Sequence, residues 1–244
     1  MERDNLLVSD LDGTMLGDDE ALERFAKWYQ SHQADLRLAY ATGRFFDSVV
    51  TSIRTTALPE PDAVIGAVGT EITLYPDARN LDGWPPNSDR WDPEAIKAVL
   101  AKHGELEPQP AEAQTRFKLS YYAYDLSPSF VERLRDELAD AGYAVETIYS
   151  SSRDLDVLPA GVGKGSAVGF LAAQWGVPRT RVMVAGDTGN DASMFTAGGF
   201  RGIVVANAQP ELKTLQADDV YHSDHGFAAG VLDGVQYWLK QQAR

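Results

Sequence analysis

Four carboxylates stand in two short polar segments, each of which directly follows an apolar run. Asp10 and Asp12 lie two residues apart in the first segment, and Asp187 and Asp191 lie four residues apart in the second. Brought to one place, four acids repel one another unless a divalent cation lies among them, and oxygen-only ligands suit Mg²⁺. The sequence therefore predicts a magnesium site that neutralises phosphate oxygens and holds a substrate in line with a nucleophile.

A carboxylate is also the nucleophile that the sequence favours, because the chain has no cysteine and no Gly-x-Ser-x-Gly turn. Asp10 would attack phosphorus and form an aspartyl-phosphate, and Asp12 could protonate the leaving oxygen and then activate water. Thr42 would offer its hydroxyl and backbone N–H to phosphate. Lys164, at the expected start of a helix, would supply a cation to the transferring phosphoryl group.

Each of these features has an ordinary alternative when taken alone. Asp-x-Asp-Gly is a common surface turn, and Lys164 could be a solvated lysine at a helix start. The prediction rests on their joint occurrence in one order, each after an expected strand or at a helix N-terminus.

A parallel sheet is the element that would bring these residues together. Short apolar runs alternate with segments of helical periodicity, which is typical of a parallel α/β fold. In such a sheet, ligands bind beyond the carboxyl ends of the strands. The expected strands are 6–9, 36–41, 63–68, 182–185 and 203–206, and the expected helices lie around 22–29, 45–53, 164–175 and 227–239.

The pattern changes between residues 83 and 160. Trp84-Pro85-Pro86-Asn87-Ser88 is a cluster that no central strand or helix would tolerate. Asp92-Pro93 and Ser127-Pro128 are typical helix starts, and Gly142 is a typical helix end. Strands are expected at 117–124, 145–149 and 155–158. We interpret this segment as a small α+β module inserted into a larger domain of residues 1–82 and 161–244.

The overall composition limits the classes of partner. A net charge of −14, without a run of four basic residues, argues against nucleic acid. No apolar run approaches the roughly 20 residues that span a bilayer, and the N-terminus does not resemble a secretory signal. We therefore expect a cytoplasmic protein with no membrane partner, which also fits the absence of cysteine. In so acidic a chain, a site for a phosphorylated substrate must be locally positive.

The polar segments together resemble the four motifs of the haloacid dehalogenase superfamily. They are Asp10-Leu11-Asp12-Gly13-Thr14, Thr42-Gly43-Arg44, Lys164 and Gly186-Asp187-Thr188-Gly189-Asn190-Asp191. The resemblance implies an α/β fold with a Rossmann-like parallel-sheet core, and a cap over residues 83–160 that selects the substrate. It implies Asp10 as nucleophile and Asp12 as acid and base.

The same resemblance implies the ligands of the metal and of the phosphate. Mg²⁺ would be held by Asp10, Asp12 (through its backbone carbonyl) and Asp187, with Asp191 in support. The phosphate would be bound by Thr42, Gly43, Lys164 and Asn190. The superfamily also contains mutases and ATPases, and an Asp at position 12 favours hydrolysis without separating a phosphatase from a mutase.

Further stretches are similar to sucrose-phosphate phosphatases of cyanobacteria and plants and, in part, to mannosylfructose-phosphate phosphatases. They are residues 38–44, 67–72, 118–121, 154–159 and 207–212. This resemblance implies a phosphorylated, fructose-containing disaccharide, with sucrose 6-phosphate as the first choice. Sugar hydroxyls need paired donors and acceptors. The candidate sugar contacts are Thr70, Glu71, Lys118, Asp154, Asn207 and Gln209.

Parts of the sequence also have to be compared with the patterns of other protein classes. A nucleotide-binding loop at 161–166 is rejected, because Leu158 stands where its first glycine belongs and Gly165 where its Ser or Thr belongs. A non-catalytic binding protein would have lost a catalytic acid, and none is lost. A phosphomutase, or a phosphatase for another sugar phosphate, stays open. We expect a monomer, and the resemblance suggests a sugar-phosphate synthase as a protein partner.

Overall fold

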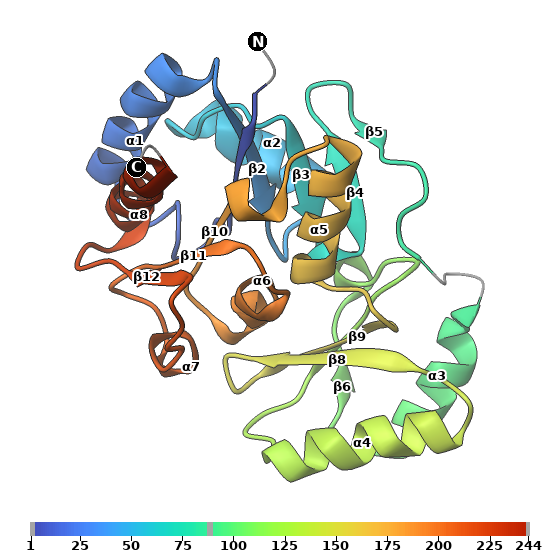
Figure 1. Ribbon diagram of the computed structural model, residues 1–244. Coiled ribbons are helices and arrows are strands. Elements are labelled where there is room, and N and C mark those ends of the chain that lie inside the picture. The colour runs from blue at the N-terminus through green and yellow to red at the C-terminus, as the bar shows by residue number, and fades with distance from the viewer. Residues whose placement is uncertain (1–2, 87–89, 243–244) are drawn as a thin grey trace. The chain divides into compact units, whose positions relative to one another are not determined.

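Figure 1 shows the computed structural model, which describes residues 3–86 and 90–242. The chain forms two compact units. The first comprises Met1–Asp82 and Lys164–Arg244, and the second comprises Gly83–Gly163. The breaker cluster predicted at 84–88 therefore lies at the start of the second unit, and its residues 87 and 88 fall outside the described part of the chain.

The first unit is built on an eight-stranded sheet in the order β12-β11-β10-β1-β2-β3-β4-β5. Its strands are β1 (Asn5–Ser9), β2 (Leu36–Ala41), β3 (Ala63–Gly66), β4 (Glu71–Leu74), β5 (Arg79–Asn80), β10 (Val182–Gly186), β11 (Arg201–Val204) and β12 (Val220–His222). Among these strands, the pairs β3–β4 and β4–β5 are antiparallel and the other pairs are parallel. The chain order reverses at β1, which pairs with both β2 and β10. Parallel α/β sheets bind ligands at this kind of switch point.

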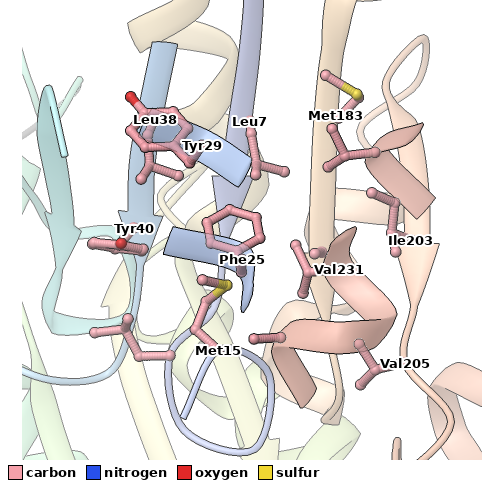
Figure 2. Packing of buried hydrophobic residues seen from close by; sticks show 14 of the residues in the cluster. Leu7, Met15, Phe25, Tyr29, Leu38, Tyr40, Met183, Ile203, Val205 and Val231 are labelled. Atoms are coloured by element: carbon pink, nitrogen blue, oxygen red, sulfur yellow. The ribbon is translucent and has the colours of Figure 1, made fainter. Parts of the chain in front are cut away.

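Helices cover the sheet of the first unit on both faces. Helices α1 (Asp19–His32), α2 (Phe46–Thr55) and α8 (Phe227–Gln242) share one hydrophobic cluster, in which Phe25 and Val231 of the helices meet Leu7 of β1 (Figure 2). The neighbouring strand residues Leu6 and Val8 are also fully buried but lie outside that cluster, because successive side chains of a strand point to opposite faces. Helix α5 (Lys164–Gln174) packs with α6 (Ala192–Thr196) and contacts β3. The apolar runs in the sequence follow from burial on both faces.

The helix starts show why the capping residues in the sequence are informative. Asp18 caps α1 by accepting a hydrogen bond from the Ala21 N–H at 2.9 Å, and two further acids lie in the first turn. A carboxylate satisfies a free N–H there and interacts favourably with the helix dipole. Helix α1 is thereby fixed directly after the turn that carries the first pair of acids.

The second unit has its own sheet and its own core. Its strands are β6 (Glu107–Pro108), β7 (Leu119–Tyr122), β8 (Val145–Ser150) and β9 (Asp154–Pro159), in the antiparallel order β6-β7-β9-β8. Helices α3 (Pro93–Leu100) and α4 (Pro128–Asp140) begin after the predicted caps Asp92 and Ser127. Ile96 of α3, Leu134 of α4 and Leu155 of β9 belong to one buried cluster. The unit is therefore the α+β type of module that the sequence indicates.

Several predicted boundaries differ from the structure. The strand predicted at 63–68 ends at Gly66, because Ala67 and Val68 have φ of 48° and 61°, which no strand accommodates. The strand predicted at 117–124 is shorter, and the one predicted at 203–206 begins two residues earlier. The short elements β4, β5, β6, β12, α6 and α7 (Pro210–Lys213) were not predicted, since a few residues carry little periodicity. Within the described ranges, no helix has the length and apolar character that a bilayer crossing requires.

Candidate active site

Asp10 lies at the centre of the carboxyl edge of the core sheet. It directly follows β1, and its backbone N–H donates to the Ala185 carbonyl of β10 at 2.9 Å. Asp187 directly follows β10, so the pairing of these two parallel strands brings the two acids to the same edge. The side chains of both acids are almost completely buried.

Lys164, the first residue of α5, is fully buried and contacts three residues of the polar segments. Its Nζ donates to Asp10 Oδ1 at 2.7 Å, to Asp191 Oδ1 at 2.6 Å and to Asn190 Oδ1 at 2.9 Å. Burial alone lowers the pKa of Lys164, but the charges of Asp10 and Asp191 outweigh burial and raise it above its ordinary value. The alternative of a solvated lysine is therefore excluded, and Lys164 is a fixed cation beside Asp10.

Three carboxylates form a compact group that could hold a metal ion. Oxygens of Asp10, Asp187 and Asp191 all lie within 4.8 Å of one another. Burial, followed by the charge of Asp191, raises the pKa of Asp187 to about 6. Burial also raises the pKa of Asp10, while Lys164 opposes that rise. One ammonium does not balance three buried carboxylates, so a divalent cation fits the charge and the oxygen donors of this site.

The turn after Asp10 has to be a glycine followed by a small hydroxyl residue. Gly13 has a φ of +82°, and a Cβ built there would lie 2.3 Å from Asp187 Oδ2. The next residue, Thr14, donates from Oγ1 to Asp187 Oδ1 at 3.0 Å. Glycine is favoured in this backbone region and is needed where side chains approach so closely. Gly13 and Thr14 of this pattern are therefore explained by their close contacts with Asp187.

Asp12, the predicted acid and base, lies outside this carboxylate group. Its carboxylate forms a two-point ion pair with Arg44, and its side chain is 58% exposed. This hydrogen bonding, despite partial burial, raises the pKa of Arg44. The sequence placed Arg44 in a motif but assigned it no role, because nothing local indicates a pairing across 32 residues. The backbone carbonyl of Asp12 as a metal ligand stays a prediction.

The loop of Thr42 and Gly43 differs in one respect from the prediction. The Thr42 N–H, which we had expected to bind phosphate, donates to the Ile65 carbonyl at 2.8 Å, because the pairing of β2 with β3 continues through this residue. The Thr42 hydroxyl accepts from the Arg44 N–H at 3.1 Å and keeps its own proton to donate. The side chain of Thr42 thus stays a candidate phosphate contact.

Four of the predicted sugar contacts belong to the first unit. Thr70 is buried and donates to the Ala67 carbonyl, and Glu71 begins β4 directly after it. The 67–70 segment is joined to the Thr42 loop by a hydrogen bond from the Val68 N–H to the Thr42 carbonyl at 3.1 Å. Gln209 donates from its backbone N–H to the Asp187 carbonyl at 2.7 Å.

Asn207 uses both ends of its amide on the backbone of the same unit. Its Nδ2 donates to the Gly13 carbonyl at 2.7 Å, and its Oδ1 accepts from the Phe227 N–H at 2.8 Å. Asn207 therefore ties the turn after Asp10 to the start of α8. The sequence did not indicate this contact, because Asn207 and Gly13 are 194 residues apart.

The two candidates in the second unit belong to one hydrogen-bond network, because the Gln109 N–H donates to the Ser120 carbonyl at 2.9 Å. Lys118 is buried and donates from Nζ to Ser120 Oγ at 2.6 Å, with Asp156 Oδ1 at 3.4 Å. Asp154 accepts from Arg153 Nη2 at 2.7 Å and from Gln109 Nε2 at 2.9 Å. A role in sugar binding stays a prediction for both.

With a site that cleaves phosphate esters, as the sequence predicts, replacing Asn207 by Ala should lower the rate for each of these esters. Two backbone groups lose their partner, which we expect to reduce the unfolding free energy by about 1–3 kcal/mol. Because the Gly13 turn would loosen, kcat should fall alike for a sugar phosphate and for p-nitrophenyl phosphate. Steady-state kinetics and urea unfolding would measure both effects. A raised KM for the sugar phosphate alone would instead make Asn207 a sugar contact.

Known proteins resemble this chain along its whole length. A family model described as sucrose-6F-phosphate phosphohydrolase matches residues 3–239. The chain is 33% identical over 238 residues to mannosylfructose-phosphate phosphatase of Agrobacterium fabrum, and the match covers 96% of each chain. It is 32% identical over 249 residues to sucrose-phosphatase 1 of Nicotiana tabacum, but it spans only 59% of that protein's length.

Solved structures agree with these relatives. The sucrose-phosphatase of Synechocystis sp. PCC6803, solved in complex with sucrose and phosphate, superposes with a TM-score of 0.90 at 32% identity, covering 97% of this chain and 98% of that one. A haloacid dehalogenase-like hydrolase from Bacteroides thetaiotaomicron superposes with a TM-score of 0.66 at 17% identity, covering 97% and 98%. The second similarity concerns the fold, and it agrees with the predicted α/β class.

Proposed function

Because the chain belongs to the sucrose-6F-phosphate phosphohydrolase family, we propose that it hydrolyses sucrose 6-phosphate to sucrose and phosphate. A phosphoric monoester hydrolase needs a nucleophile and a fixed positive charge beside the phosphoryl group. The observation that carries the proposal is the contact of Asp10 Oδ1 with the buried Lys164 Nζ at 2.7 Å, at the switch point of the sheet. This contact supports the proposal because it sets a carboxylate and a buried cation side by side at the switch point of the sheet.

Asp10 and Asp187 are the side chains best placed to hold Mg²⁺. Asp191 has both oxygens engaged, Oδ1 by Lys164 and Oδ2 by the N–H groups of Asp187 and Thr188 at 3.0 and 3.1 Å. Among the described residues, Oδ2 of Asp10 and Oδ2 of Asp187 accept no such bond. We therefore assign Asp191 a supporting role that orients Lys164 and the 187–188 backbone. When bound, the metal would neutralise phosphate oxygens and lower their repulsion of the nucleophile.

The residues of the chain account for both halves of the reaction. Asp10 attacks phosphorus, and the bond to the sugar oxygen breaks as Asp12 protonates that oxygen. Asp12 then removes a proton from a water molecule that attacks the aspartyl-phosphate, which restores Asp10 and releases phosphate. The Lys164 ammonium and the Thr42 hydroxyl stabilise the charge on the phosphoryl oxygens. Gly43 and Asn190 are proposed to complete the phosphate pocket, Asn190 through its bond to Lys164.

The identity of the sugar is the part of the proposal with a specific rival. The match to mannosylfructose-phosphate phosphatase covers 96% of both chains, so mannosylfructose phosphate is the second candidate. We assign the choice of sugar to the second unit as a cap, with Lys118 and Asp154, and to Thr70, Glu71 and Gln209 of the first. A cytoplasmic sugar-phosphate synthase would supply either substrate.

Phosphate release from a panel of sugar phosphates in the presence of Mg²⁺ tests the proposal. The panel contains sucrose 6-phosphate, mannosylfructose phosphate, trehalose phosphate, and the phosphates of glucose and fructose. We expect sucrose 6-phosphate to have the highest kcat/KM, with sucrose identified as the product. A preference for mannosylfructose phosphate would select the second candidate, and transfer of the phosphoryl group to another hydroxyl would indicate a mutase. If no sugar phosphate of the panel released phosphate, the assignment of a disaccharide phosphate as substrate would be refuted.

The affinity for Mg²⁺ should fall as the pH drops below about 6. In the absence of metal, burial and Asp191 raise the pKa of Asp187 to about 6, so a proton competes with the metal below that pH. Below that pH, Asp187 alone should contribute a roughly tenfold weakening per pH unit, because its proton has to leave. Asp10 should extend the dependence to higher pH, since burial raises its pKa too. Titration calorimetry between pH 5 and 8 measures the effect, with Asp62→Asn as the control because Asp62 pairs with Arg3 outside the acid group, and a flat profile would contradict it.

A further inference from the structure

Asp12 is held by a single side chain that is itself fixed at several points. Arg44 Nε donates to Asp12 Oδ2 at 2.7 Å, and Arg44 Nη2 donates to the other carboxylate oxygen. The third guanidinium nitrogen, Nη1, donates to Ser52 Oγ of α2 at 2.8 Å. The backbone of Arg44 is bound as well, since its carbonyl accepts from the Ala67 N–H at 3.0 Å. The backbone of Arg44 is therefore anchored to the segment that follows β3, and its guanidinium is anchored to helix α2.

The carboxylate of Asp12 would have considerable freedom without this partner. Its side chain is 58% exposed, and within the described residues its carboxylate has hydrogen bonds to Arg44 alone. A planar guanidinium that binds both oxygens sets the plane as well as the position of a carboxylate, which a lysine does not do. Proton transfer depends strongly on such orientation, because a misplacement of about 1 Å can cost a hundredfold in rate.

We propose that Arg44 is a positioning residue that orients the Asp12 carboxylate for proton transfer to the leaving sugar oxygen. The inference rests on the proposed function, in which Asp12 is the acid and base. Ser52 takes part because its hydroxyl keeps the guanidinium in the plane that Asp12 requires. Arg44 thus acts through Asp12, at the end of the sheet where Asp10 lies, and needs no contact with the substrate.

Substrates with different leaving groups distinguish a positioning role of Arg44 from a merely structural one. A sugar alkoxide leaves only with a proton, whereas p-nitrophenolate leaves readily without one. General acid catalysis contributes roughly 10²–10⁴-fold, so Arg44→Gln should lower kcat/KM for the sugar phosphate by about tenfold or more. The kcat/KM for p-nitrophenyl phosphate should change less than about threefold, because this ratio reports the steps up to cleavage of the ester bond. A loosened loop would lower both alike.

A double-mutant cycle with Asp12→Asn completes the test. If Arg44 acts through Asp12, adding Arg44→Gln to Asp12→Asn should cause no further loss for the sugar phosphate. Arg44→Lys keeps the charge without the planar pair and should recover only part of the rate. Arg3→Gln is the matched control, because Arg3 also binds a carboxylate at two points, Asp62 at 3.0 and 2.5 Å, away from the site residues. We expect it to leave the ratio of the two substrates unchanged.

Each outcome bears on one of the two hypotheses. Equal losses for both substrates, or additive losses in the double variant, would overturn the role of Arg44 while leaving Asp12 as the acid. If Asp12→Asn lowered kcat/KM equally for the sugar phosphate and for p-nitrophenyl phosphate, the proposed function of Asp12 itself would be refuted. Unfolding curves of all variants in Mg²⁺ would show that each one is folded under the conditions of the assay.

Discussion

Turnover of the sugar phosphate is expected to disappear when Asp10 is replaced by Asn, by more than about 10⁴-fold, because an amide oxygen cannot form the aspartyl-phosphate. The fold should survive this change. Asn has nearly the same volume, its oxygen can still accept from Lys164, and one of three crowded carboxylates loses its charge. In the absence of metal we therefore expect an unfolding free energy equal to or above that of the unchanged protein.

Phosphate release and urea unfolding, measured on the same preparation, test this expectation. Asp62→Asn serves as control, because Asp62 is a carboxylate of the same unit that pairs with Arg3 rather than with the acid group. The control should keep its activity. Substantial residual turnover in Asp10→Asn, after spontaneous deamidation is excluded by mass spectrometry, would mean that another residue or a water molecule attacks phosphorus.

Replacing Lys164 by Met should reduce both the rate and the stability. The change leaves Asp10 and Asp191 buried without their shared cation, and breaking a buried ion pair costs about 3–5 kcal/mol. The transferring phosphoryl group also loses a fixed positive charge, which we expect to lower kcat by about 10²–10³-fold. Added Mg²⁺ should return part of the stability, because it restores positive charge among the acids, and little of the rate.

A second substitution separates these two effects. Lys164→Met combined with Asp191→Asn removes one of the stranded carboxylates, so the double variant should regain stability without regaining activity. Unfolding free energies with and without Mg²⁺, together with kcat, measure this. A loss of rate below tenfold in Lys164→Met would place the Lys164 charge outside the reaction. An activity that returns together with stability would mean that Lys164 serves only the fold.

The order of the polar segments was enough to predict that Asp10 and Asp187 lie together at one edge of the sheet. Parallel strands end at the same edge, so the sequence predicted Asp10 and Asp187 at one edge, and the structure shows that β1 and β10 are neighbours. Lys164 followed from its place at a helix start, and the structure shows it in contact with Asp10. The helix caps Asp92 and Ser127 could also be predicted from the sequence, because capping depends on a few adjacent residues.

The contacts that orient the catalytic groups depend on how loops from distant parts of the chain meet. The pairing of Arg44 with Asp12 and the bond from Asn207 to the Gly13 carbonyl join residues 32 and 194 positions apart. Periodicity and capping rules do not predict contacts between such distant residues. The composition of the segment around Ala67 likewise does not predict the positive φ of Ala67, at which β3 ends. The sequence by itself determined the fold class and the acids at the sheet edge, because these follow from local patterns along the chain, and it determined the family through the resemblance of its motifs. Only the tertiary structure decided which donor holds each acid, because that choice depends on the packing of loops against one another.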